Sequence, residues 1–142
     1  MTSLSLAGNA LETIPANALL PTSITTLHLE RNKFATLRDV ALAKTLPALR
    51  HLSLKHNRIR ATAYQHDGEQ DAFPITLEEL DLSHNNITVW SVVDALPVLF
   101  PGLTSLRLSH NEIYHSEDAF TTTVARLGKL ETLNYSTVRF RC

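Results

Sequence analysis

Apolar and polar residues follow one recurring order along this chain. Each copy begins with three apolar residues, the second three positions after the first and the third two positions after the second. An asparagine follows three positions after the third apolar residue, and a last apolar residue stands two positions after the asparagine. Copies with the asparagine start at Met1, Ile24, Leu49, Leu77 and Leu103, and a sixth copy starts at Leu130 with Val138 in the asparagine position. The alternation predicts a short strand with one face in the core. We expect the asparagine to bond backbone groups where the chain turns out of the strand.

This spacing is that of the leucine-rich repeat. It predicts an α/β solenoid of about five to six repeats covering residues 1–142 as one domain. Short parallel strands would form the concave face, and helices or irregular turns would form the convex face.

Two helices are expected on the convex face. The first follows Asn85, with Pro97 ending or bending it and with inward-facing positions at Trp90, Val93, Leu96 and Phe100. The second follows Asn111. Its expected N-cap is Ser116, its first turn holds Glu117 and Asp118, its inward residues are Phe120, Val124 and Leu127, and Gly128 ends it. Residues 61–74 show no apolar periodicity and are predicted as a polar loop on the outer face.

Composition and charge exclude several classes of function. The net charge is −1, and no run of lysines and arginines is long enough to predict nucleic-acid binding. The longest apolar run is far shorter than the ~20 residues of a membrane span, and no secretory signal is visible. The one cysteine, Cys142, cannot form an internal disulfide, which favours a reducing, cytoplasmic compartment. No catalytic motif or cofactor signature is present, so we expect a binding module that is not an enzyme and carries no cofactor.

The first repeat starts at the first residue, so no residue of this sequence would cover its strand. A solenoid end of this kind exposes apolar core and a strand edge. We therefore expect the chain to be part of a longer protein or to be capped by a partner.

Several stretches resemble one family of repeat proteins. They are "LFPGL" at Leu99–Leu103, the strand and turn Leu106–Tyr114, "ARLG" at Ala125–Gly128 and "LNYS" at Leu133–Ser136. They resemble the leucine-rich-repeat region of tubulin-folding cofactor E in its fungal forms, although Glu112 stands where many members have proline. The resemblance implies a cytoplasmic protein that binds α-tubulin during assembly or disassembly of the αβ heterodimer, together with other tubulin cofactors.

Two other interpretations were weighed. The alternative is a generic cytosolic repeat adaptor, such as the phosphatase-regulator type, which has similar short repeats. An extracellular receptor fragment is disfavoured, because its ends would carry cysteine-bonded caps and this chain has a single cysteine.

The alignment of repeats predicts which side chains are neighbours on the concave face. Equivalent positions form columns with a spacing of about 4.8 Å. Asp81 is expected beside Arg107, and Glu30 beside Lys55. The predicted partner-binding residues are His28, Glu30, Arg31, Lys55, His56, Asp81, His84, Arg107 and His110.

Three histidines form a column of their own just before the asparagines. His56, His84 and His110 occupy the same position in consecutive repeats. Such a column is compatible with a metal site or a pH-sensitive patch. No cysteine or acidic residue in the same column completes a metal site, so we favour a polar residue suited to the turn.

Overall fold

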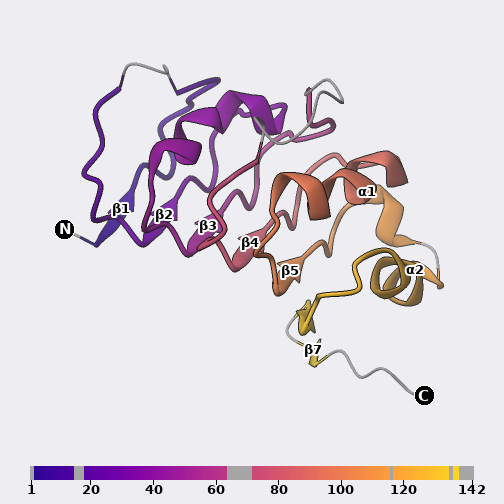
Figure 1. Ribbon diagram of the computed structural model, residues 1–142. Helices are drawn as coiled ribbons and strands as arrows, with labels where there is room; N and C mark the ends of the chain where they lie inside the picture. Colours follow the sequence, from indigo (N-terminus) through magenta and orange to yellow (C-terminus); the bar gives the residue numbers. More distant parts are fainter. Residues whose placement is uncertain (1, 15–17, 64–71, 116, 135, 138–142) are drawn as a thin grey trace.

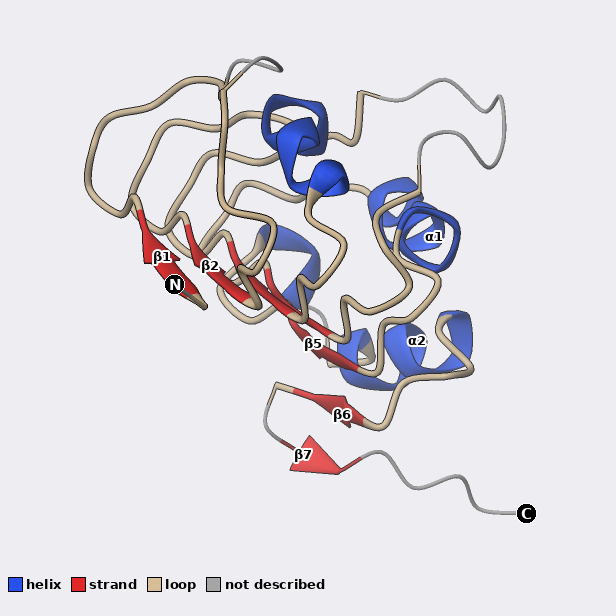
Figure 2. Cartoon of the chain, turned by 60° about the vertical axis from the view of Figure 1, so that its left-hand side comes forward, coloured by secondary structure: helices blue, strands red, loops and turns tan. Residues whose placement is uncertain are grey.

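The computed structural model describes all residues except 1, 15–17, 64–71, 116, 135 and 138–142. Seven short strands form one sheet in chain order (Figures 1 and 2); β1 to β6 run parallel, and β7 is antiparallel to β6. The strands are β1 (Ser3–Ser5), β2 (Thr26–His28), β3 (His51–Ser53), β4 (Glu79–Asp81), β5 (Ser105–Arg107), β6 (Thr132–Leu133) and β7 (Ser136–Thr137). The α-helices are α1 (Trp90–Leu99) and α2 (Ala119–Arg126), and the 3-10 helices are η1 (Leu37–Thr45) and η3 (Glu112–His115). The predicted repeat solenoid is confirmed.

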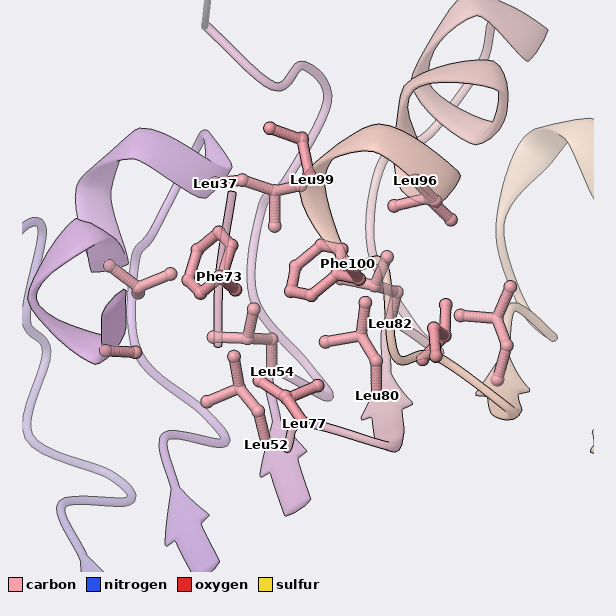
Figure 3. Packing of buried hydrophobic residues seen from close by; sticks show 14 of the residues in the cluster. Leu37, Leu52, Leu54, Phe73, Leu77, Leu80, Leu82, Leu96, Leu99 and Phe100 are labelled. Atoms are coloured by element: carbon pink, nitrogen blue, oxygen red, sulfur yellow. The ribbon is translucent and has the colours of Figure 1, made fainter. Parts of the chain in front are cut away.

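The register of the sheet follows the sequence repeats. The middle leucines Leu4, Leu27, Leu52, Leu80 and Leu106 are partners from β1 to β5. In the strands β2 to β5 this leucine is buried and its two neighbours are partly or fully exposed. The helices lie on one side of the sheet (Figure 1), and Leu52 and Leu80 belong to the buried cluster on that side (Figure 3). The other face of the strands is therefore left to polar side chains.

The repeat asparagines hold successive turns together. The Asn85 Nδ2 atom donates to the carbonyls of Leu82 in its own repeat and of Leu54 in the preceding repeat, both at 3.0 Å. Its Oδ1 atom accepts from the Ile59 amide at 3.0 Å. Asn57 and Asn111 make the same set of bonds, and all three are at least 93% buried. Each asparagine thus satisfies backbone groups of two repeats that an apolar side chain would leave unpaired.

The convex face matches the predicted helices with two corrections. Helix α1 buries Val93, Leu96 and the following Phe100 as expected, and it continues through the exposed Pro97 to Leu99. Helix α2 begins later than predicted, because its N-cap is Asp118, which makes no side-chain cap bond. The proposed cap Ser116 lies outside the described residues.

The second correction concerns Phe120 in α2. Its side chain is 39% exposed, so it was wrongly assigned to the inward face. The buried positions of α2 are the small residues Ala119 and Thr123, and the Thr123 hydroxyl donates to the Ala119 carbonyl at 2.7 Å. Small residues there allow the helix to lie close to η3, and a phenylalanine side chain is accommodated only on the outside.

Phe73 shows that the segment 61–74 is more than a polar loop. Its side chain is 98% buried and stacks on Phe100, with ring centroids 4.5 Å apart (Figure 3). The Lys44 ammonium lies over the Phe73 ring, 5.4 Å from the ring centroid. The prediction missed this residue because one apolar side chain produces no periodicity. Residues 64–71 lie outside the described residues.

The last repeat departs from the predicted columns at Asn134. This residue is in the left-handed region (φ 50°), and the chain then reverses into β7. The Asn134 Oδ1 atom accepts from the Leu108 amide at 2.7 Å, where preceding repeats use a backbone carbonyl, such as that of Arg107 for Leu82. The alignment of repeats would place Ser136 and Thr137 in the parallel columns of the preceding repeats, but they form an antiparallel strand, so that assignment is wrong. Over the residues described, no helix is long and apolar enough to cross a membrane.

Candidate functional site

The open face of strands β2 to β5 is hollowed. The hollow has a volume of about 420 Å³, and its floor is formed by the middle leucines and the polar residues beside them. Five of the predicted site residues line it: His28, Glu30, Lys55, Asp81 and Arg107. The other four, Arg31, His56, His84 and His110, lie one position before the asparagines, in the turns that leave the strands. The structure thus divides the predicted set between the hollow and an adjoining edge.

Asp81 and Arg107 are paired, as their columns predicted. The Arg107 Nη1 atom lies 3.4 Å from the Asp81 Oδ2 atom, and the side chains are 34% and 13% exposed. The Asp81 Oδ1 atom also accepts from the Ser83 amide at 2.9 Å and the Ser83 hydroxyl at 2.6 Å. The carboxylate is therefore fixed in the floor of the hollow, and the guanidinium lies over it.

Glu30 is paired with a different residue than expected. Its Oε1 atom lies 3.0 Å from the Nδ1 atom of His28, the last residue of β2, and no ion pair of the described residues joins it to Lys55. Burial acts to raise the pKa of Glu30, but hydrogen bonds from His28, its own backbone and Ser53 outweigh burial. The pKa consequently lies below its ordinary value.

Sequence reasoning missed another pair in the hollow. The His51 Nδ1 atom of β3 lies 2.8 Å from the Glu79 Oε2 atom of β4. One position earlier, the Arg50 Nη2 atom lies 3.2 Å from the Glu78 Oε2 atom. These residues precede the middle leucine, whereas the columns considered from the sequence followed it. The same alignment of repeats contains the signal, since His51 and Glu79 are register partners.

The histidine column is stacked ring on ring. The centroids of His56 and His84 lie 4.1 Å apart, and those of His84 and His110 lie 4.0 Å apart. All three residues have φ between 56° and 59°. Arg31 (φ 56°) and Gly8 (φ 72°) occupy the same position in the first two repeats. Histidine is among the residues that accept this left-handed conformation more readily than most, so the turn explains why a polar residue of this kind recurs.

The stack affects the charge of its central ring. Partial burial lowers the pKa of His84, and the positive charges of His110, His56 and Lys55 lower it further, while Asp81 acts in the other direction. Among the residues described, no group of three or more histidine, cysteine and acidic side chains is placed to hold a metal ion. The arrangement instead offers polar, paired charges in a wide and open hollow, which suits recognition of a macromolecular surface.

Comparison with known proteins agrees with the repeat fold. A family model described as "Leucine Rich repeat" matches residues 74–89. The solved structure of the Drosophila melanogaster SNF/U2A' complex contains a chain that superposes with a TM-score of 0.80 over 96% of this chain and 74% of that chain, at 20% identity. That likeness concerns the fold alone.

Curated relatives are of several kinds. Podocan-like protein 1 of Mus musculus is 38% identical over 85% of this chain, and tubulin-folding cofactor E of Arabidopsis thaliana is 33% identical over 97%. The chain spans only 20% and 28% of these two proteins. Fibromodulin of Sus scrofa is 34% identical over 72% of this chain, which covers 79% of that sequence. With its repeats, its parallel sheet and these relatives, the chain belongs to the leucine-rich repeat family.

Proposed function

We propose that this chain is a cytoplasmic, non-catalytic module that binds α-tubulin during assembly or disassembly of the αβ heterodimer. The observation that supports this proposal is the similarity to tubulin-folding cofactor E across 97% of the chain. A second relative of this kind, tubulin-specific chaperone E of Danio rerio, is 32% identical over 79% of the chain. Other tubulin cofactors would act on the same substrate.

The hollow on the open face is the surface we assign to this binding. It spans four strands, so a partner could contact several repeats at once. Its carboxylates are paired, within one repeat for His28–Glu30 and between neighbouring strands for His51–Glu79 and Asp81–Arg107. A partner that carries complementary charges can exchange these pairs for its own, which favours specificity more than affinity.

Asp81 and Arg107 are the pair best placed to discriminate partners. They lie in the middle of the sheet, and Asp81, at 13% exposed, is the most buried side chain among the three ion pairs of the hollow. Partial burial reduces screening by solvent, so a change of charge sign there has more effect on a bound surface than one at the rim.

The test is capture by the immobilised chain, first from a cytosolic extract with identification by mass spectrometry and then with purified αβ-tubulin in a direct binding assay. Enriched α-tubulin and saturable binding of the purified heterodimer are the expected results. A phosphatase catalytic subunit enriched in place of tubulin would contradict the proposal and favour the adaptor alternative.

A matched pair of variants places the contact. The double variant Asp81→Arg and Arg107→Asp keeps an ion pair but reverses its direction in the hollow. The double variant Asp94→Arg and Arg126→Asp does the same to the Asp94–Arg126 ion pair of the two convex helices. We expect the first to abolish capture and the second to leave it intact. Equal loss in both would remove the hollow as the binding surface.

A further inference from the structure

The turns after β2 and β3 carry a cluster of positive side chains. We define the basic edge as Arg31 and Lys33, on either side of Asn32, together with Arg58 and Arg60, which follow Asn57. All four side chains are exposed, whereas the apolar residues between them, Phe34 and Ile59, are fully buried. The turns therefore direct their charges outward and their apolar residues inward.

Backbone bonds hold the two turns side by side. The Arg58 amide donates to the Phe34 carbonyl at 2.9 Å, and the Arg60 amide donates to the Ala35 carbonyl at 3.0 Å. The Arg31 amide donates to the Lys55 carbonyl at 3.1 Å on the strand side. Since adjacent turns are separated by about one strand spacing of 4.8 Å, cations from both repeats are close neighbours. Such a cluster is costly in self-repulsion unless an anion is near.

These four cations have no partner among the described residues. No ion pair or side-chain hydrogen bond among the described residues involves them, whereas the carboxylates of the hollow, Glu30, Glu79 and Asp81, are each paired with a histidine or an arginine. Glu30 is directed to His28. Asp39 of η1 is also engaged, because its Oδ2 atom accepts from the amides of Ala35 and Thr36, each at 3.0 Å. The carboxylates of Glu30 and Asp39 are thus engaged elsewhere and do not neutralise the basic edge.

We propose that the basic edge is a second interaction surface, separate from the hollow, and that it binds an extended acidic segment of a protein. Four unpaired cations on two parallel turns complement a short row of carboxylates, because an extended chain advances about 3.3 Å per residue and can place side chains against both turns. Three of the four are arginines, whose planar guanidinium groups bond carboxylates at two points.

The surroundings of the edge favour a short acidic peptide over a long nucleic acid. The net charge of the chain is −1, so a polyanion extending beyond the two turns would meet no general positive field. The aromatic residue in these turns, Phe34, is fully buried and cannot stack on a base. The exposed ring beside the edge, His56, is already stacked on His84.

The edge is tested with a fluorescein-labelled oligoglutamate of about eight residues, long enough to span both turns. Its binding to the full chain is measured by fluorescence anisotropy at low salt and again at higher salt. Saturable binding that weakens as salt rises is expected. An oligolysine of equal length is the control for charge and is expected not to bind.

Two double variants locate the binding. Arg58→Gln with Arg60→Gln removes two charges from the basic edge, and Arg126→Gln with Lys129→Gln removes two from the region of α2. We expect the double variant of the basic edge to lose about tenfold in affinity for the oligoglutamate, and the double variant near α2 to lose less than about twofold. Equal losses of peptide affinity in the two double variants would overturn the proposal, as would failure of the oligoglutamate to bind. Tighter binding of an oligothymidylate of equal charge would overturn it in favour of nucleic acid. The outcome is independent of tubulin capture, because the peptide assay uses no tubulin and leaves the hollow unchanged.

Discussion

Two columns that are adjacent in sequence behave in opposite ways in the fold. The asparagines Asn57, Asn85 and Asn111 are buried, and each bonds backbone groups of two repeats. The histidines directly before them lie in the turn, stack on one another and have a left-handed backbone. The asparagines and the histidines are therefore repeated for different reasons. One column satisfies buried backbone groups, and the other provides a conformation that most residues adopt at a cost.

Replacement of a central asparagine should have the largest effect on stability. In Asn85→Ala the carbonyls of Leu54 and Leu82 and the amide of Ile59 lose their partner in a buried region. We expect the free energy of unfolding to fall by about 3–5 kcal/mol, because each unsatisfied buried group costs about 1–3 kcal/mol. Urea denaturation followed by circular dichroism measures it. A loss below about 1 kcal/mol would show that water replaces the side chain and that the column is not what holds the turns.

Asn134 provides a milder version of the same test. Its side chain accepts from the amides of Leu108 and Ser109, at 2.7 and 3.2 Å, but in a partly buried place at the end of the sheet. Asn134→Ala should lower the free energy of unfolding by about 1–3 kcal/mol. Asn134→Asp keeps the acceptor oxygen and serves as the control. If the free energy of unfolding falls equally in both variants, the side-chain oxygen of Asn134 is not the group that replaces the backbone carbonyl.

The stability of His84 variants should depend mainly on how well the new residue tolerates the left-handed backbone, and little on the loss of the imidazole. His84→Val places a β-branched residue at φ 56°, and we expect a loss of about 1–2 kcal/mol. His84→Asn, which tolerates this conformation, should change stability by less than about 0.5 kcal/mol. Thermal melting of the two variants in parallel decides the matter. Equal losses would mean that the stacked rings, rather than the turn, account for the histidine.

The pH dependence of stability gives the smallest expected effect. The pKa of His84 is lower in the folded chain than its ordinary value, through burial and the charges of His110, His56 and Lys55, so the unfolded chain binds the proton more tightly. The resulting penalty is absent well above the ordinary pKa of about 6.5, begins as pH falls through that value, and is complete below the folded-state pKa. Melting temperatures at neutral and mildly acidic pH should fall less for His84→Asn than for the original chain. An equal fall in melting temperature for the variant and the original chain would show that His84 does not contribute to the pH dependence of stability.

The sequence was sufficient for the solenoid because its signal is repeated. Leu80 and Leu106 identify the same strand position in two repeats, and the register in the structure is the one read from the alignment. The same reasoning found the Asp81–Arg107 pair. Features that occur once were not predictable in this way. Phe73 is buried by a contact with Phe100 that no spacing encodes, and α2 turns Ala119 and Thr123 inward, which leaves Phe120 partly exposed.

Pairing of charges was the least predictable property of the candidate site. Glu30 has Lys55 in the neighbouring column but bonds His28 on its own strand, because a residue two positions away on the same face is within reach of its carboxylate. Arg58 and Arg60 could be read from the sequence as charged, but only the structure shows that they lie beside the turn of the preceding repeat and have no partner within the described part of the chain. Equivalent positions are fixed by the backbone, whereas the choice among neighbouring partners depends on side-chain geometry.

The central claim is that buried columns hold the fold and that the polar face of the sheet binds the partner. The direct test is αβ-tubulin binding by the Asp81→Arg and Arg107→Asp variant, with its melting temperature recorded on the same sample. We predict a folded variant whose melting temperature falls by several degrees, because Ser83 loses its bonds to Asp81, and a loss of tubulin binding of at least about tenfold. Binding at the original affinity by this folded variant would contradict the claim.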